Sequence, residues 1–190
     1  RLLADAFLGA AAVIARELPG SVFVVPCLRP DIAKWVDASV SRYPGLNVVT
    51  YAGDARLALT ACEGALVKSG TGTLEAMLLG RPMVVSYKLG ELTYRLIRRL
   101  LHTRFIALPN ILAGEELVPE LLQHAATPEA LAENLLAQLD KARCEPEYLA
   151  RFADLHQQLR KGADVRAADA VARLLYEDRE ANQVVGRRDV

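Results

Sequence analysis

The stretch GALVKSGTGTLEAMLLGRPMVVSY, residues 64–87, decides the fold because it holds a strand, a loop, a helix and a second strand in succession. Its apolar start predicts a strand, and the small polar residues 69–72 predict a tight loop. The run 73–79 predicts a helix, and the β-branched run 82–87 predicts the next strand. Two strands joined by a helix pair in parallel, so this unit indicates a parallel sheet.

Strands and helices alternate along the rest of the first half of the chain. Upstream of the central unit, helices are predicted at 2–18, 31–43 and 54–62, and strands at 21–26 and 44–51. Such alternation predicts an α/β fold: a Rossmann-like open parallel sheet with helices on both faces, followed by C-terminal helices.

The pattern changes after Asn110, where apolar periodicity indicates helices alone. These helices are predicted at 114–123, 128–142, 146–162 and 163–178. A further helix is predicted before Asn110, near 92–101. We therefore expect a Rossmann-like domain over residues 1–125, C-terminal helices over 126–178 that pack on it or on a partner domain, and a frayed polar tail over 179–190.

Composition limits the classes of function. The chain has 190 residues, 52% of them hydrophobic, and its 23 Lys and Arg equal its 23 Asp and Glu, so no overall field draws it to nucleic acid. Three widely spaced cysteines argue against a disulfide framework or a zinc site, so we expect no metal. The least charged run, 2–15, is shorter than the roughly 20 residues of a membrane span. A reducing cytoplasm fits best.

The loop 69–72 lies where open α/β sheets bind ligands, at the carboxyl end of a strand and the N-terminus of a helix. Gly70 and Gly72 allow close backbone approach, while Ser69 and Thr71 supply hydroxyls for a phosphate or for a helix cap. The Walker A pattern is absent, and Glu75 stands where the dinucleotide fingerprint needs its third glycine. The loop therefore predicts an anion site of another kind, or an ordinary turn.

Glu75 is the charged residue of this helix, about one turn from its start. Its carboxylate is well placed to accept hydrogen bonds from the two hydroxyls of a ribose. Alternatively, it only complements the helix dipole, which contributes roughly 0.3 to 1 kcal/mol. Position alone leaves both interpretations open.

Two blocks of sequence together resemble a known family. SGTGTLEAMLLGRPMVVSYK at 69–88 and LPNILAGEELVPELLQ at 108–123, joined by an apolar and basic helix, resemble the C-terminal half of the lipid-A-disaccharide synthases, glycosyltransferases of GT-B architecture. The similarity runs from about residue 5 to about residue 176. It implies that the chain binds UDP-2,3-diacylglucosamine as glycosyl donor, and that an acylated glucosamine phosphate accepts the sugar, with release of UDP. No cofactor or metal is implied.

The resemblance also assigns roles to residues. It places Ser69, Gly70 and Thr71 at the donor diphosphate and Glu75 at the uridine ribose, and Gly72 is expected among the substrate-binding residues. Tyr87 and Asn110 would line the same cleft, although Tyr87 can equally be a packing residue and Asn110 a helix cap. The first strand of the domain, its glycine-serine-arginine loop and a whole N-terminal domain are expected before residue 1.

An inverting transfer needs a general base as well as groups that stabilise the departing diphosphate. By the resemblance, the base lies in the N-terminal domain, so the catalytic residue is unknown here and this chain alone is expected to be inactive. His102, His124 and His156 sit in helical patterns and receive no role.

The segment 94–105 carries four arginines among apolar residues and has no acidic residue. This pattern fits either an interfacial helix on anionic lipid or an ordinary solvated helix face. Since the implied substrates carry acyl chains, we expect a cytoplasmic protein peripheral on the inner membrane. The C-terminal helices either cross to the N-terminal domain or pack on a second copy in a homodimer.

Two other functions stay open from the sequence. One is another UDP-sugar enzyme of the same architecture, such as a peptidoglycan glycosyltransferase or a UDP-sugar epimerase. The other is a non-catalytic α/β binding module.

Overall fold

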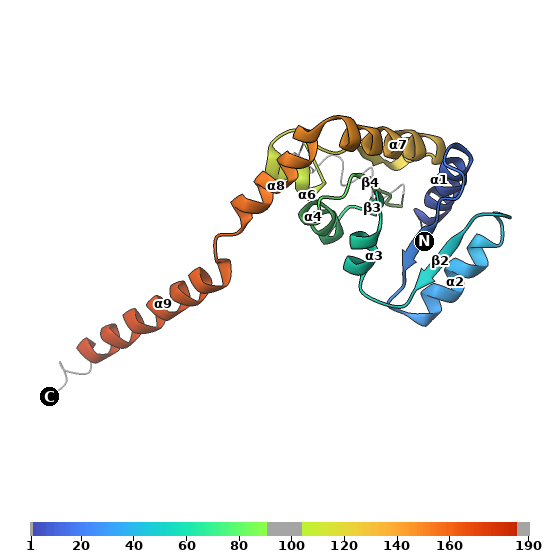
Figure 1. Ribbon diagram of the computed structural model, residues 1–190. Coiled ribbons are helices and arrows are strands. Elements are labelled where there is room, and N and C mark those ends of the chain that lie inside the picture. The colour runs from blue at the N-terminus through green and yellow to red at the C-terminus, as the bar shows by residue number, and fades with distance from the viewer. Residues whose placement is uncertain (1, 91–103, 186–190) are drawn as a thin grey trace. The chain divides into compact units, whose positions relative to one another are not determined.

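The computed structural model describes residues 2–90 and 104–185 and divides the chain into two compact units, Arg1–Leu155 and His156–Val190. Figure 1 shows strands alternating with helices through the first unit. Its elements are α1 (Ala4–Glu17), β1 (Phe23–Pro26), α2 (Pro30–Val40), β2 (Val48–Tyr51), α3 (Ala55–Ala61), β3 (Ala65–Lys68), α4 (Thr71–Leu78), β4 (Met83–Tyr87), α6 (Leu108–Ala113), β5 (Glu120–Leu122), the 3₁₀ turn η1 (Gln123–Ala125), α7 (Pro128–Cys144) and α8 (Pro146–Leu159), which runs past the unit's end.

All the strand pairs of residues 2–90 and 104–185 are parallel, which confirms the predicted α/β class. β1 pairs with β2, with Phe23 opposite Val48. β4 lies between β3 and β5, with Lys68 opposite Ser86 and Val85 opposite Glu120. Because parallel strands end on the same side, the loops after β3, β4 and β5 gather at one carboxyl edge.

Helices cover both faces of the three-stranded sheet, because neighbouring residues of β4 point into different apolar clusters. Met83 and Val85 pack with α4, α6 and α8 residues, including Met77 and Phe152. Val84 packs on the other face with residues of α1 and α7. Figure 1 shows α1 and α7 side by side, and the two helices are in contact. The apolar core thus holds the carboxyl edge of the sheet from both sides.

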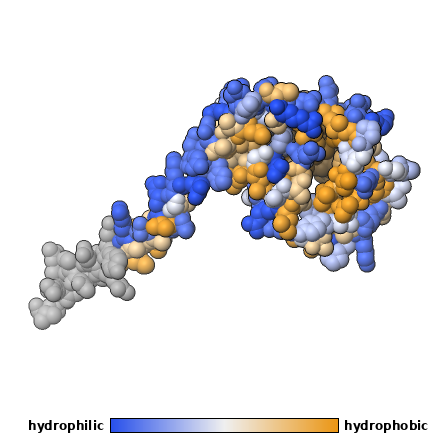
Figure 2. Space-filling model, in the orientation of Figure 1, coloured by the Kyte–Doolittle hydropathy of each residue, from blue (hydrophilic) through white to orange (hydrophobic). Residues whose placement is uncertain are grey.

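Apolar side chains also reach the surface of this unit, as the orange areas of Figure 2 show. Several of them belong to β1, β2 and the elements beside these strands: Val22, Val24, Leu28, Val49 and Leu57. The two-stranded sheet is therefore less completely covered than the three-stranded one.

The predicted helix at 114–123 is wrong. The helix lies earlier, at α6, because Pro109 suits a first turn and Gly114, at φ 72°, ends the helix in the left-handed conformation. Residues 120–122 instead form β5, where pairing with β4 overrides the helical spacing of the leucines. The helix predicted near 92–101 lies outside the described residues.

The second unit contains the helix α9 (Ala163–Val185). Its exposed apolar side chains include Val165, Val171, Leu174 and Leu175. This helix extends to Val185, into the segment 179–190 for which the sequence predicts a polar tail. In the described part of the chain, no helix has both the length and the apolar character needed to cross a membrane.

Candidate functional site

The loop after β3 is an open corner at the carboxyl edge of the sheet. Gly70 adopts φ 149° and ψ −165°, a conformation that essentially only glycine takes, and it precedes the first residue of α4. Among the described residues, apart from the chain neighbours of Gly70, no heavy atom lies within 4 Å of the place where a Cβ would stand on it. The turn into α4 thus sets the conformation of Gly70, and the residue is open on the side where a side chain would stand.

Hydroxyl groups surround this corner and differ in their availability. The buried Thr73 donates its hydroxyl to the Gly70 carbonyl at 2.7 Å, and Ser69 donates to the Ile106 carbonyl at 3.0 Å. Thr71 is exposed, and no side chain among the described residues caps α4. The Thr73 amide also donates to the Gly70 carbonyl, at 3.1 Å. The amides of Thr71 and Gly72 and the Thr71 hydroxyl therefore remain available to an anion.

Glu75 lies half-buried on α4, one turn beyond the corner. Within residues 2–90 and 104–185 its carboxylate forms no hydrogen bond or ion pair. Its charge does reach Arg56 at the start of α3: the pKa of Arg56 is raised, mainly by its hydrogen bond and charge interaction with Asp54, and further by the charge of Glu75. The carboxylate is thus free to accept hydrogen bonds from a ligand.

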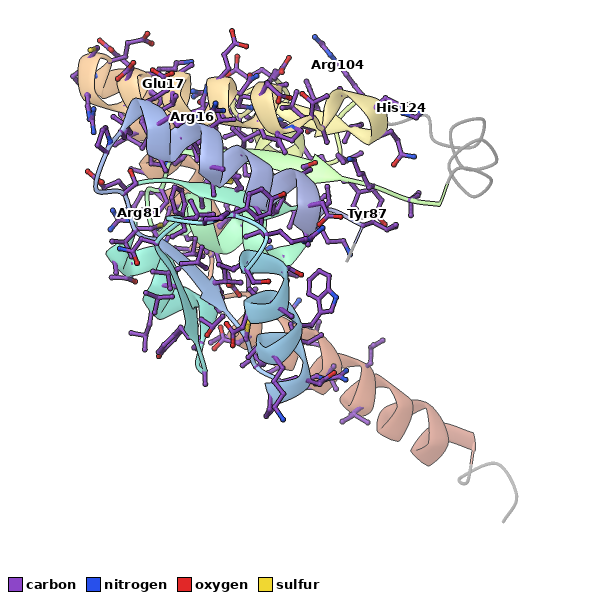
Figure 3. All side chains as sticks on the ribbon, turned by 90° about the vertical axis from the view of Figure 1, so that its right-hand side faces the viewer. Arg16, Glu17, Arg81, Tyr87, Arg104 and His124 are labelled. Carbon is purple, nitrogen blue, oxygen red and sulfur yellow. The ribbon has the colours of Figure 1, made fainter. Side chains whose placement is uncertain are left out.

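Tyr87 ends β4 next to the corner. Its ring is half-buried, and the Lys68 ammonium lies 5.5 Å from the ring centroid, a cation–π contact between neighbouring strands. Figure 3 shows Tyr87 and His124 toward the same side of the structure. The sheet register thus brings Tyr87 beside Ser69 and Gly70 at the carboxyl edge.

Asn110 does not join this group of available side chains. It is fully buried in α6, and its amide nitrogen donates to the Val118 carbonyl and to Glu120, both at 2.8 Å. Its amide oxygen accepts from the backbone amides of Leu117 and Val118. These four bonds use both donor hydrogens and both acceptor lone pairs of the side-chain amide, so Asn110 fixes the chain between α6 and β5.

Glu120 was missed by sequence reasoning and organises the same region. Its carboxylate accepts from the amides of Ile106 and Ala107, at 3.0 and 2.9 Å, as well as from Asn110. Since the Ile106 carbonyl accepts the Ser69 hydroxyl, this network reaches the corner. Because Glu120 lies inside the helix predicted at 114–123, the sequence gave no sign that its carboxylate would bind these groups.

A pocket of about 640 Å³ lies at the carboxyl ends of β4 and β5. Its described lining includes Lys88, Leu89, Gln123 and His124, but none of residues 69–72. Gln123, at φ 50°, is the one non-glycine residue with positive φ in the described chain. The sequence gave no signal for it, because its contacts lie far along the chain.

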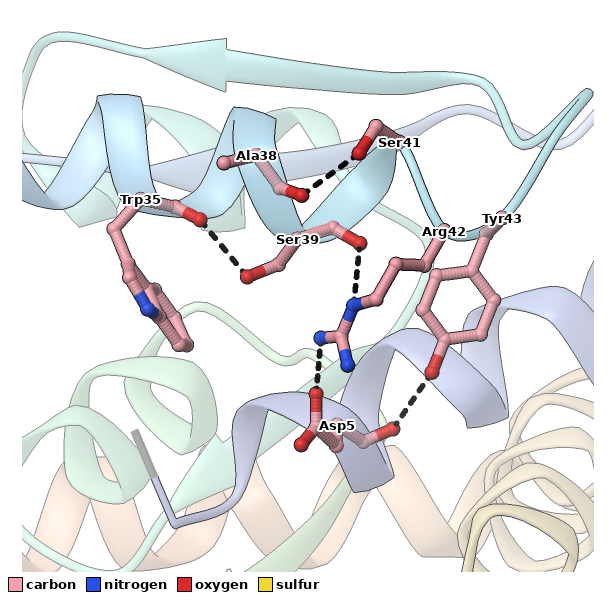
Figure 4. Close-up of polar contacts among 7 residues, drawn as sticks. All are labelled: Asp5, Trp35, Ala38, Ser39, Ser41, Arg42 and Tyr43. Carbon is pink, nitrogen blue, oxygen red and sulfur yellow. Dashed lines mark hydrogen bonds and ion pairs between the residues drawn. The ribbon is translucent and has the colours of Figure 1, made fainter.

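The opposite wall of the pocket includes Asp5 and Tyr43. Figure 4 shows Asp5 joined to the loop after α2 by an ion pair with Arg42, while the Tyr43 hydroxyl donates to the Asp5 carbonyl at 3.4 Å. The negative charge of Asp5 is therefore partly balanced by Arg42. The described residues contain no cluster of His, Cys, Asp or Glu able to hold a metal ion.

The fold defines the class first: this is a Rossmann-like parallel α/β domain with an open glycine corner at its carboxyl edge. Its architecture resembles the crystal structure of the glycotransferase of kitacinnamycin, with a TM-score of 0.55 and 21% identity over 88% of this chain and 38% of that one. The chain belongs to the lipid-A-disaccharide synthetase family, whose sequence model matches residues 1–171.

Individual relatives agree with this family. The lipid-A-disaccharide synthase of Burkholderia thailandensis is 45% identical over 174 residues, which is 92% of this chain and 45% of the relative. That of Burkholderia pseudomallei strain 1710b is 44% identical with the same coverage. The chain therefore spans about half the length of the curated relatives it matches.

Proposed function

We propose that this chain is the donor-binding half of a lipid-A-disaccharide synthase. The longer protein would transfer 2,3-diacylglucosamine from UDP-2,3-diacylglucosamine to 2,3-diacylglucosamine 1-phosphate, releasing UDP. Family membership supports the reaction. The observation that carries the binding role is the open, uncapped corner of Gly70 beside the unpaired carboxylate of Glu75.

The corner supplies what a departing diphosphate requires. The first amides of α4 and the exposed Thr71 hydroxyl would donate to phosphate oxygens, and Gly70 and Gly72 would let the backbone approach. Ser69 donates to Ile106, so its oxygen would join only if that hydroxyl turned toward the ligand. Because these donors are backbone and hydroxyl groups, they would stabilise the developing negative charge directly.

Glu75 would accept hydrogen bonds from the ribose hydroxyls, and Tyr87 would line the neighbouring part of the cleft. The general base would lie in the part of the relatives that this chain does not cover, so the chain alone would transfer no sugar. The acylated substrates favour attachment of the whole enzyme to the cytoplasmic face of the inner membrane. A homodimer, with the C-terminal helices on a second copy, remains part of the proposal.

Calorimetry with UDP and with inorganic diphosphate tests the binding role. Glu75→Ala should weaken UDP binding about tenfold, because ribose hydrogen bonds to a charged group are lost, and should change diphosphate binding less than about twofold. The control is Glu133→Ala on α7, an exposed glutamate that does not line the pocket. Equal losses for both ligands would remove the ribose role, and a wild-type chain without UDP binding would refute the proposal.

A further inference from the structure

We propose that Lys88 contacts the diphosphate of the donor and that Gln123 is the positioning residue that holds Lys88 there. This inference rests on the proposed function and deepens it. It assigns a basic side chain to an anion site that otherwise consists of backbone amides and hydroxyls.

The Gln123 side chain forms two hydrogen bonds with the backbone just after β4. Its side-chain oxygen accepts from the Leu89 amide at 2.7 Å, and its side-chain nitrogen donates to the Leu89 carbonyl at 3.3 Å. These two bonds resemble those between neighbouring strands, and they fix Leu89, the residue after Lys88. A second tie, from the Ser86 hydroxyl to the Leu121 carbonyl at 2.8 Å, holds the end of β4 to β5.

The backbone of Gln123 is strained to make these two bonds to Leu89. A left-handed conformation is unfavourable for a residue with a Cβ, and Gln123 adopts φ 50° while only 6% exposed. Such strain persists where the surroundings impose it, and it often marks a functional site. Here it turns the chain at the end of β5 so that the side chain points back across the carboxyl edge to Leu89.

The sheet register places the held segment beside the corner. Lys68 lies opposite Ser86, and the Ser69 amide donates to the Ser86 carbonyl at 2.9 Å, so the pairing continues past the end of β3. The pairing ends there, because Gly70 leads into α4, and Lys88 follows Ser86 by two residues at the same carboxyl edge of the sheet. Two neighbouring strands are about 4.8 Å apart, and a lysine side chain spans that distance easily.

The local charge suits an anion. Lys88 is half-buried and lines the pocket, whose described acidic residue, Asp5, is already paired with Arg42. A phosphate oxygen would meet the ammonium as a charge-assisted hydrogen bond, which is stronger than a neutral one. The ligand class that fits the corner and Lys88 together is therefore a nucleoside diphosphate rather than a nucleoside.

The first arm of the test compares UDP with uridine by calorimetry on the 190-residue chain. Lys88→Gln should weaken UDP binding about tenfold and leave uridine within about twofold, because only UDP carries the phosphate charge. Lys34→Gln, at an exposed lysine of α2, removes the same charge elsewhere and should change neither affinity. Added salt should weaken UDP binding to the wild type more than to Lys88→Gln.

The second arm tests the positioning role. Gln123→Gly relieves the backbone strain and removes the two bonds to Leu89, so the melting temperature should fall little while UDP binding weakens as much as in Lys88→Gln. The double variant should be no weaker than either single variant, because both remove one interaction. Hydrogen exchange of the Leu89 amide should be slow in the wild type and fast in Gln123→Gly.

The outcomes separate the two levels of the proposal. If the wild type binds neither UDP nor uridine, the proposed function fails and this inference with it. If the wild type binds UDP and Lys88→Gln binds it equally well, only the inference is overturned. If Gln123→Gly stays folded, frees the Leu89 amide and keeps its UDP affinity, the positioning role is overturned, whatever the result for Lys88.

Discussion

The carboxyl ends of β3 and β5 both place a residue at positive φ, and the two residues solve the same geometric problem differently. Gly70 needs no support, because it has no Cβ and faces open space. Gln123 is buried and held in place by two bonds to Leu89. One turn is open for a ligand, whereas the other is braced from within.

The difference teaches how the edge divides its tasks. At β3 the backbone amides stay unpaired by side chains, which is what recognition of an anion requires. Around β5 the polar groups of Asn110, Glu120 and Gln123 are paired with the backbone of neighbouring segments. We call residues 69–72 the open region and residues 110–123 the braced region. The bonds of the braced region determine where the loops beside the open region lie.

The largest effect is expected from a substitution in the braced region. Asn110→Ala leaves the Val118 amide and carbonyl without a partner, and it removes one of the bonds made by Leu117 and by Glu120. Leu117 keeps its bond to the Glu115 carbonyl, and Glu120 keeps those from Ile106 and Ala107. Because two buried backbone groups lose their partners, the free energy of unfolding should fall by about 2 to 4 kcal/mol. Urea unfolding followed by circular dichroism measures this change. Asn134→Ala on α7 is the matched control, since its amide makes one bond, to Ala130, and its loss should cost less than about 1 kcal/mol.

An Asn110→Ala protein that stays within about 1 kcal/mol of the wild type but loses UDP binding would reverse this assignment. Asn110 would then be a ligand contact, as the family resemblance implied.

A smaller effect sharpens the glycine side of the comparison. Gly70→Ala forces a Cβ into a conformation that essentially only glycine takes and should cost about 1 to 3 kcal/mol. Gly72→Ala is the control, because Gly72 lies inside α4 and its Cβ would meet only Val67, at 3.5 Å. That variant should be neutral or slightly stabilising, since alanine favours the helix. Thermal unfolding of the two variants distinguishes them, and equal melting temperatures would contradict the strain argument.

Sequence reasoning predicted the glycine turn after β3, although α4 begins at Thr71 rather than at residue 73, and it predicted the region around β5 poorly. The corner 69–72 was found because its residues are consecutive and its conformation is local. β5 was missed because three residues that include Glu120 carry little strand signal, and pairing with β4 decides their structure. Gln123 and Glu120 were missed because their partners, Leu89 and Ile106, lie 34 and 14 residues away.

The alternation of strands and helices was predictable for the same reason as the corner. Runs such as 82–87 combine β-branched residues with burial on both faces, a pattern that few other structures share. Asn110 shows the limit: its position in the sequence fitted a cap or a ligand contact, whereas in the fold its side chain bonds to the backbone of Leu117 and Val118.

The smallest expected effect concerns a third carboxyl end, that of β2. Asp54 caps α3 and forms an exposed ion pair with Arg56, whose hydrogen bonds, from side chain and then backbone, hold the pKa of Asp54 below its ordinary value of 3.8. Because the folded pKa is the lower one, this contribution to stability is present above the unfolded value and is lost as the pH falls through the folded value. Arg56→Gln should return the Asp54 pKa toward its ordinary value in an NMR titration and leave the melting temperature at neutral pH nearly unchanged, since exposed ion pairs contribute little. It should also leave UDP affinity within about twofold, because the interaction of Arg56 with Glu75 is electrostatic only. A larger loss of UDP affinity would show that the end of β2 belongs to the binding region, and the contrast between an open and a braced edge would then have to include it.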